Sequence, residues 1–197
     1  MDEARADLDA RMAFLVEAGR LTEVDRATRV VGGQRQENSA EHSWHLALFA
    51  MTLSPHAPEG VSIDRVIRML LLHDLVEIDA GDVPFFGAGA EDTAAQEARE
   101  QEAADRLFGL LPPSQAAEFR AIWDEFEAAE TPDARFAKSV DRFQPPVLNL
   151  VTGGGSWRDF NVTEDRIHAR LGPKIERGAP DLWSWLRPRI AAFFARD

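Results

Sequence analysis

The chain has 197 residues, of which 45% are hydrophobic and 28% are charged, and its formal net charge is -12. No apolar run is long enough to cross a bilayer, and the acidic excess opposes contact with a nucleic-acid backbone, so we expect neither membranes nor nucleic-acid polymers as partners. Cysteine is absent, which excludes disulfides, thiolate zinc sites and cysteine nucleophiles.

The N-terminus reads MDEARADLDARM, which has neither the basic start nor the apolar centre of a secretory signal. We therefore expect a cytoplasmic protein. No shift of composition and no low-complexity linker divides the chain, so residues 1–197 are expected to form one domain. The first predicted helix has apolar residues at helical spacing, namely Leu8, Met12, Leu15 and Val16.

Helical spacing of apolar residues continues along the chain, and no sustained alternation predicts a strand. Cap residues precede several of the predicted helices, namely Asn38, Ser62, Thr131 and Thr163. Gly81 is expected to end a helix over residues 62–80, and Pro145-Pro146 to interrupt the helix that contains Asp141. The expected fold is an all-α bundle of roughly seven or eight helices.

The segment MLLLHDLVEIDAGD at 69–82 places polar residues beside apolar ones in that predicted helix. His73 and Asp74 both point at least partly inward there, next to Leu70 and Leu71. Burying an unpaired carboxylate is costly, so a cation or hydrogen bonds must satisfy the pair. A divalent metal ion would satisfy both residues. From spacing alone, separate polar contacts at helix ends explain them equally well.

Two other predicted helices offer further metal ligands. His42 begins an inward stripe that continues with Leu46, and Asp141 lies at a core edge beside Val140. Together with His73 and Asp74 they form a nitrogen and oxygen donor set that suits one divalent transition ion, Mn²⁺, Fe²⁺, Co²⁺, Ni²⁺ or Zn²⁺. His45, one turn beyond His42, is either a ligand or, as we favour, a support for the ligands.

These motifs, in this order, resemble the HD-domain metal-dependent phosphohydrolases, and within them the 5'-deoxynucleotidase-like branch. That signature is a His, a later His-Asp doublet and a distant Asp, and it matches segments 35–50, 69–82 and 131–145. The resemblance implies an HD-type helical bundle, a divalent metal ion and a homodimer. It also implies that a metal-activated water removes phosphate from nucleoside 5'-monophosphates or from a related small phosphate ester.

The resemblance also assigns roles to further residues. Glu77 is expected to be catalytic by moving a proton, and Asp82 to orient the attacking water. Arg26 is the first candidate for binding the phosphate, with Arg35 as the second, and Lys138 adds a positive charge. The chain departs from this branch in two places. The segment that ends at Arg26 reads LTEVDR, whereas the branch often has Leu-Lys shortly before that arginine. The chain also has no clear match for a tryptophan that selects deoxyribose in some relatives.

Two other functions fit the same residues. One is hydrolysis of a larger nucleotide signal at a phosphodiester or pyrophosphate bond. The other is a non-catalytic module that binds a nucleotide or a metal ion. The presence of both Glu77 and Asp82 favours an enzyme over the binding module.

Overall fold

Helices make up most of this computed structural model, which describes residues 2–87 and 93–196. Its α-helices are α1 (Asp2–Ala18), α2 (Ser39–Thr52), α3 (Ile63–Leu72), α4 (Glu77–Ala80), α5 (Thr93–Phe108), α6 (Pro113–Ala128), α7 (Pro132–Val151), α8 (Gly155–Asp159), α9 (Glu164–Arg170), α10 (Gly172–Glu176) and α11 (Pro180–Phe194). Three 3-10 helices join them, η1 (Gly19–Glu23), η2 (Ser54–His56) and η3 (His73–Val76). The prediction of an all-α fold is confirmed.

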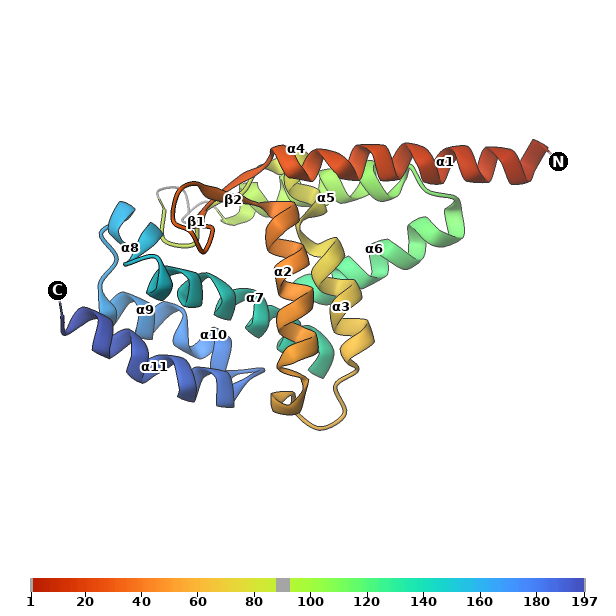
Figure 1. Cartoon of the computed structure of the whole chain (residues 1–197). Helices are drawn as coiled ribbons and strands as arrows, with labels where there is room; N and C mark the ends of the chain where they lie inside the picture. The colour runs from red at the N-terminus through yellow and green to blue at the C-terminus, as the bar shows by residue number, and fades with distance from the viewer. Residues whose placement is uncertain (1, 88–92, 197) are drawn as a thin grey trace.

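Helices α2 and α3 lie side by side in the middle of the molecule, and α7 packs against both of them (Figure 1). Their facing sides are apolar and fully buried, with Leu46 on α2, Val66 on α3 and Val140 on α7. Burial of such side chains is the main favourable term in folding. This three-helix contact is therefore the rigid base on which the polar residues of the site are placed.

Helix α1 projects beyond the rest of the protein (Figure 1). It is helical as predicted, and Phe14 packs into the core. Its predicted apolar stripe, however, is exposed to solvent, as shown by Leu8, Met12, Leu15 and Val16. Periodicity therefore identified the helix correctly and did not identify the face that packs.

A two-stranded antiparallel sheet of β1 (Asp25–Arg29) and β2 (Gln36–Asn38) precedes α2, and the sequence analysis did not predict it. Strands of five and three residues are too short to show sustained alternation. The sheet leads directly into a capping box at the start of α2, where the side chains of Asn38 and Glu41 each accept a hydrogen bond from the other's backbone N–H. It thereby brings Arg26 of β1 and Glu37 of β2 next to the start of α2.

The helix predicted over residues 62–80 is divided by η3. Trp123 of α6 donates its indole N–H to the carbonyl of His73 at 3.1 Å. The backbone N–H of Glu77, which would bond that carbonyl in a regular α-helix, bonds the carbonyls of Asp74 and Leu75 instead. This tightens the turn into 3-10 geometry. Gly81 ends α4 as predicted, with a positive φ of 75°.

The prediction that Pro145-Pro146 interrupts a helix is wrong, because α7 continues through both prolines to Val151. The missing N–H groups remove the usual helical partners of the Asp141 and Arg142 carbonyls. The flanking side chains of Phe143 and Leu148 are buried on both sides of the prolines. We attribute the continuity of the helix to this packing.

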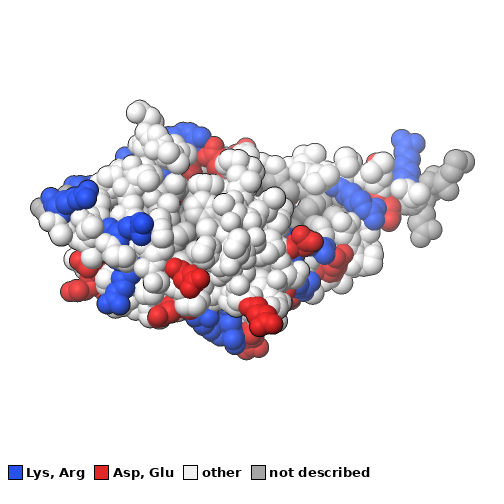
Figure 2. All heavy atoms as spheres, turned by 60° about the horizontal axis from the view of Figure 1, so that its bottom comes forward, with Lys and Arg blue, Asp and Glu red and all other residues white. Residues whose placement is uncertain are grey.

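None of the described helices combines the length and the apolar character that crossing a bilayer requires. Figure 2 shows a face of the molecule on which charged side chains lie mainly toward the edges. Leu48 of α2 and Trp185 of α11 are exposed, and together with Phe143 of α7 they line an apolar groove of about 480 Å³.

Candidate metal centre

The four predicted metal ligands meet at the junction of α2, η3 and α7. His42 Nε2 lies 3.1 Å from Asp141 Oδ1 and 4.0 Å from Asp74 Oδ2. His73 Nε2 lies 2.9 Å from Asp74 Oδ1 and 3.9 Å from Asp141 Oδ1. One donor atom from each of His42, His73 and Asp141 lies within 4.8 Å of the others, and all four side chains are buried. We call these four residues the ligand cluster.

The ring of His73 is fixed so that one nitrogen faces this cluster. Its Nδ1 lies 2.9 Å from the carbonyl of Leu70, so Nδ1 carries the proton and donates it there. Its Nε2 is buried and faces the cluster, 2.9 Å from Asp74 Oδ1. A buried nitrogen of this kind needs either a proton or a metal ion. The geometry therefore fits a metal ligand.

The charges of the cluster also favour a bound cation. Burial opposes ionisation of Asp74, but the nearby His73 ring and the charge of Arg26 outweigh it and lower its pKa. Asp141 behaves alike, since the charge of Arg142 and the hydrogen bond to His42 overcome burial and place its pKa well below the usual range. Two ionised carboxylates and two imidazoles form a donor set for a divalent transition ion.

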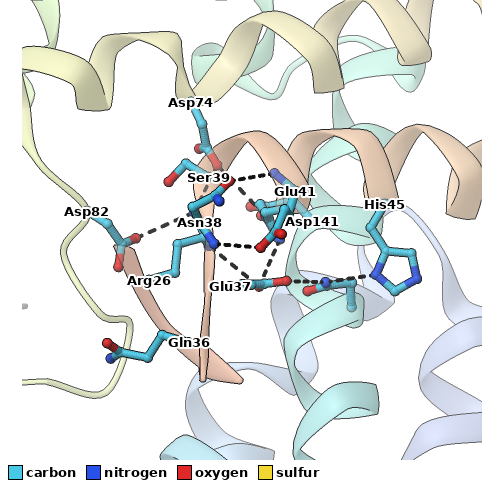
Figure 3. A network of polar contacts seen from close by, with 12 residues as sticks. Arg26, Gln36, Glu37, Asn38, Ser39, Glu41, His45, Asp74, Asp82 and Asp141 are labelled. Carbon is cyan, nitrogen blue, oxygen red and sulfur yellow. Dashed lines mark hydrogen bonds and ion pairs between the residues drawn. The ribbon is translucent and has the colours of Figure 1, made fainter. Parts of the chain in front are cut away.

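Arg26 lies among the acidic residues that adjoin the ligand cluster. Its Nη1 is 2.8 Å from Asp74 Oδ2 and 3.5 Å from Asp82 Oδ1 (Figure 3). The same nitrogen lies 3.5 Å from Glu77 Oε1. Strand β1 supplies Arg26, α4 supplies Glu77, and Asp82 follows Gly81. The structure thus brings the expected phosphate-binding arginine and both expected acids to one place.

The acids Glu77 and Asp82 retain protons more readily than ordinary carboxyl groups. Burial and the charge of Asp74 raise the pKa of Glu77 well above its usual value, and Ser39 Oγ donates a hydrogen bond to its Oε2 at 2.5 Å. Burial likewise raises the pKa of Asp82, with a further contribution from Asp74. Carboxyl groups with raised pKa values can exchange protons near neutral pH.

Glu37 is a site residue that the sequence analysis missed. It is buried, and its Oε1 lies 3.4 Å from His42 Nδ1 and 3.8 Å from Arg26 Nε. Gln144 of α7 donates its Nε2 to Glu37 Oε2 at 3.0 Å, and the same amide lies 3.2 Å from His45 Nδ1 (Figure 3). Glu37 therefore orients the His42 ring, and His45 adjoins this support instead of the ligand cluster.

A cleft of about 380 Å³ opens above three of the ligands, and Glu77 and Asp82 line it. Lys138 lies in its wall, where it pairs with Glu127 at 2.8 Å. Arg35 does not line this cleft, because its guanidinium pairs with the surface residue Glu41. Three basic residues that the sequence analysis did not consider also line it, namely Arg142, Arg170 and Lys174.

Comparison with known proteins agrees with this geometry. The sequence profile described as HD domain matches residues 18–183. The chain is 31% identical over 134 residues to the 5'-deoxynucleotidase HDDC2 of Homo sapiens, covering 66% of this chain and 62% of that protein. It is 27% identical over 168 residues to the 5'-deoxynucleotidase HDDC2 of Danio rerio, covering 82% of each. The chain therefore spans less than two thirds of the human relative's length.

Two solved structures share the fold. The crystal structure of a predicted metal-dependent phosphohydrolase from Magnetospirillum magnetotacticum MS-1 is 46% identical, covers 97% of each chain and has a TM-score of 0.89. A conserved hypothetical protein from Pyrococcus furiosus is 17% identical and covers 89% of this chain and 99% of its own, with a TM-score of 0.60. The second likeness extends to the fold alone.

Proposed function

The chain belongs to the HD domain family, and on that premise we propose that it is a metal-dependent phosphohydrolase. Its substrate is a nucleoside 5'-monophosphate, with deoxyribonucleosides favoured, or a related small phosphate ester. The observation that carries this proposal is the convergence of His42, His73, Asp74 and Asp141 at a cleft that basic side chains also line. The relatives named 5'-deoxynucleotidase support a nucleotide as substrate.

A divalent ion held by the four ligands supplies, when bound, a water of lowered pKa and polarises the phosphate. Asp82 accepts a hydrogen bond from the attacking water and orients it toward phosphorus. A new bond forms between that water oxygen and phosphorus, and the ester bond to the nucleoside oxygen breaks. Glu77 gives its proton to the leaving oxygen and regains one from the proton that the attacking water releases, so the products are a nucleoside and inorganic phosphate.

Two cations help to hold the phosphate in this scheme. Arg26 has a planar guanidinium that can donate two parallel hydrogen bonds to phosphate oxygens. It is already buried at the ligand cluster, so little side-chain entropy is lost when the phosphate binds. Lys138, farther along the cleft wall, adds a point charge that lowers the cost of bringing a dianion beside the carboxylates.

Phosphate release tests the proposed function directly. We expect purified protein to release phosphate from a panel of nucleoside monophosphates when Mn²⁺, Fe²⁺, Co²⁺, Ni²⁺ or Zn²⁺ is supplied, and a chelator to stop the reaction. The Glu77→Gln variant should lose turnover, whereas Glu59→Gln, at an exposed position in the loop between α2 and α3, should keep it. Absence of turnover with every ion and nucleotide contradicts the proposal.

The products separate the competing functions. Chromatography distinguishes release of inorganic phosphate from cleavage of a phosphodiester or a pyrophosphate bond, because each leaves a different nucleotide fragment. Binding of nucleotide without any turnover favours a non-catalytic module.

A homodimer and a cytoplasmic location stay predictions drawn from the sequence and its family resemblance. Light scattering on the purified protein gives its mass in solution, and a value near one chain contradicts the homodimer. Fractionation of cells that express the protein tests its location.

A further inference from the structure

Four basic side chains gather on one wall of the cleft. Lys138 and Arg142 stand one turn apart on α7, Arg170 ends α9, and Lys174 lies on α10, which packs against α7. All four line the same cleft as His73 and Asp141. We call these four residues the basic wall. Such a group is unexpected by composition, since the chain has 22 Lys and Arg against 34 Asp and Glu.

The ring of Phe85 holds three of these cations close together. The guanidinium carbons of Arg142 and Arg170 each lie 5.0 Å from its centroid, and Lys174 Nζ lies 5.9 Å from it. A cation over an aromatic face is attracted by the ring's quadrupole, and its charge is not neutralised. Phe85 therefore fixes the positions of these cations and leaves their charge available to an anion.

In the part of the chain that the structure describes, no carboxylate pairs with the outer cations of the basic wall. Lys138 pairs with Glu127, and Arg142 Nε lies 3.5 Å from Asp141 Oδ2. Within residues 2–87 and 93–196, Arg170 and Lys174 form no ion pair with a carboxylate. Burial and the charges of Arg142, Lys138 and Arg170 lower the pKa of Lys174, as expected where like charges are crowded. An anion bound there relieves this repulsion.

The cleft thus offers two positions for an anion. Arg26 and Arg142 contact carboxylates of the ligand cluster, so they belong with the phosphate that is hydrolysed. Arg170 and Lys174 lie near the Phe85 ring instead, and among the described residues neither forms an ion pair with a metal ligand. A cleft of about 380 Å³ is within the size range of small-molecule sites, so one ligand can reach both positions.

We propose that Arg170 and Lys174 bind a second phosphate group of the substrate. The preferred nucleotide then carries a phosphate at another position besides the group that is removed. This inference rests on the proposed function, because the ligand cluster must hold the first phosphate. Arginine and lysine are the side chains best suited to phosphate, one through paired donors and the other as a point charge.

Steady-state kinetics on the metal-loaded protein test this inference. The substrates are deoxyadenosine 5'-monophosphate and deoxyadenosine 3',5'-bisphosphate, in both of which the 5'-phosphate is a monoester. We expect kcat/KM for the bisphosphate to exceed that for the monophosphate by about tenfold, which corresponds to one favourable contact of about 1.4 kcal/mol.

The double variant Arg170→Ala/Lys174→Ala should remove this preference by raising KM for the doubly phosphorylated nucleotide. Its kcat and KM for the monophosphate should stay within about twofold of wild type, because neither residue forms an ion pair with a metal ligand. The matched control, Arg177→Ala/Arg187→Ala, removes the same charge from exposed positions outside the cleft. This control should keep the preference for the doubly phosphorylated nucleotide. In wild type and control alike, that preference should weaken as the salt concentration is raised.

Two results overturn the inference. One is a wild-type protein that does not prefer the bisphosphate, and the other is a double variant in which both substrates weaken equally. A protein that hydrolyses no nucleotide contradicts the proposed function instead. In that case, calorimetry of deoxyadenosine 3',5'-bisphosphate binding still tests the basic wall, and equal affinities for wild type and double variant refute it.

Discussion

The floor and the wall of the cleft are built in different ways. The ligand cluster on the floor is buried, and helices from three parts of the chain hold each donor atom within a few ångströms of another polar group. The outer basic wall stands at the surface on two short helices, where Arg170 and Lys174 contact an aromatic ring. Changes on the floor should therefore alter chemistry and stability together, whereas changes on the wall should alter only substrate affinity.

Removing a ligand from the floor should have the largest effect. Asp141→Asn deletes one negative donor, so we expect loss of bound metal and a fall in kcat/KM on the order of 10³-fold, equivalent to about 4 kcal/mol. Elemental analysis and phosphate-release kinetics measure the two effects. Asp64→Asn, exposed on α3, is the matched control and should change neither. If Asp141→Asn keeps its full metal content and normal turnover, Asp141 is not a metal ligand.

Glu77→Gln should come second, with kcat lower by about 10²–10⁴-fold because the proton donor is lost. The same change should stabilise the metal-free protein at neutral pH. Burial raises the pKa of Glu77 in the folded state, so the unfolded chain releases this proton at a lower pH than the folded protein does. The free energy of unfolding of wild type therefore falls as pH rises above the ordinary pKa of 4.5. Glutamine does not titrate, so this loss is absent from the variant.

Thermal denaturation without metal measures that effect. The melting temperature of Glu77→Gln minus that of wild type should be larger at pH 7.5 than at pH 4.5, by about 2–4 °C for each kcal/mol recovered. If the two melting temperatures differ by the same amount at both pH values, ionisation of Glu77 does not destabilise the folded protein.

Glu37→Gln should have a smaller effect, because Glu37 acts through His42. Loss of its charge beside His42 Nδ1 weakens the orientation of the ring, so we expect about a 10–100-fold loss of metal affinity. Competition with a chromogenic chelator measures that affinity. Glu118→Gln is the control, since Glu118 pairs with Arg68 at an exposed position and does not line the cleft. If Glu37→Gln and wild type bind the metal ion with equal affinity, Glu37 does not orient His42 for metal binding.

Lys138→Ala should have the smallest effect of the single changes. Lys138 is partly exposed and already paired with Glu127, so its loss should raise KM by about fivefold, or about 1 kcal/mol, and leave kcat and metal content unchanged. Kinetics with a nucleoside monophosphate at low and high salt measure this. If kcat falls while KM stays constant, Lys138 acts in the chemical step like the residues of the floor, and its assignment to substrate affinity alone is wrong.

The inward positions of the floor residues could be predicted from the sequence, because they lie on or beside long helices with clear apolar periodicity. Periodicity did not distinguish a metal site from separate polar contacts, and the family resemblance was needed for that choice. His42 precedes buried Leu46 by one turn, and Asp141 follows buried Val140. The sequence pattern therefore indicated that both side chains lie close to the core. Glu37 was not visible in this way. Its burial depends on a three-residue strand whose pairing with β1 leaves no pattern in the sequence.

The wall could not be predicted for a different reason. Arg170, Lys174 and Phe85 are brought together only by the way α9 and α10 return to the cleft. No local spacing links a residue at 85 to two residues beyond 169. The exposed stripe on α1 shows a related limit, since the periodicity of Leu8 and Met12 indicates a helix and not which side meets the core.

The hydrogen bond from Trp123 to the carbonyl of His73 also makes the protein its own optical probe. The indole is buried, and it reports directly on the backbone of a metal-binding segment. A shift of that segment when the site fills changes the surroundings of this fluorophore. Trp44 and Trp185 are exposed, so a soluble quencher can suppress their emission. Buried Trp157 and Trp183 still emit, and subtracting the signal of a Trp123→Phe variant leaves the Trp123 emission to follow metal occupancy in real time.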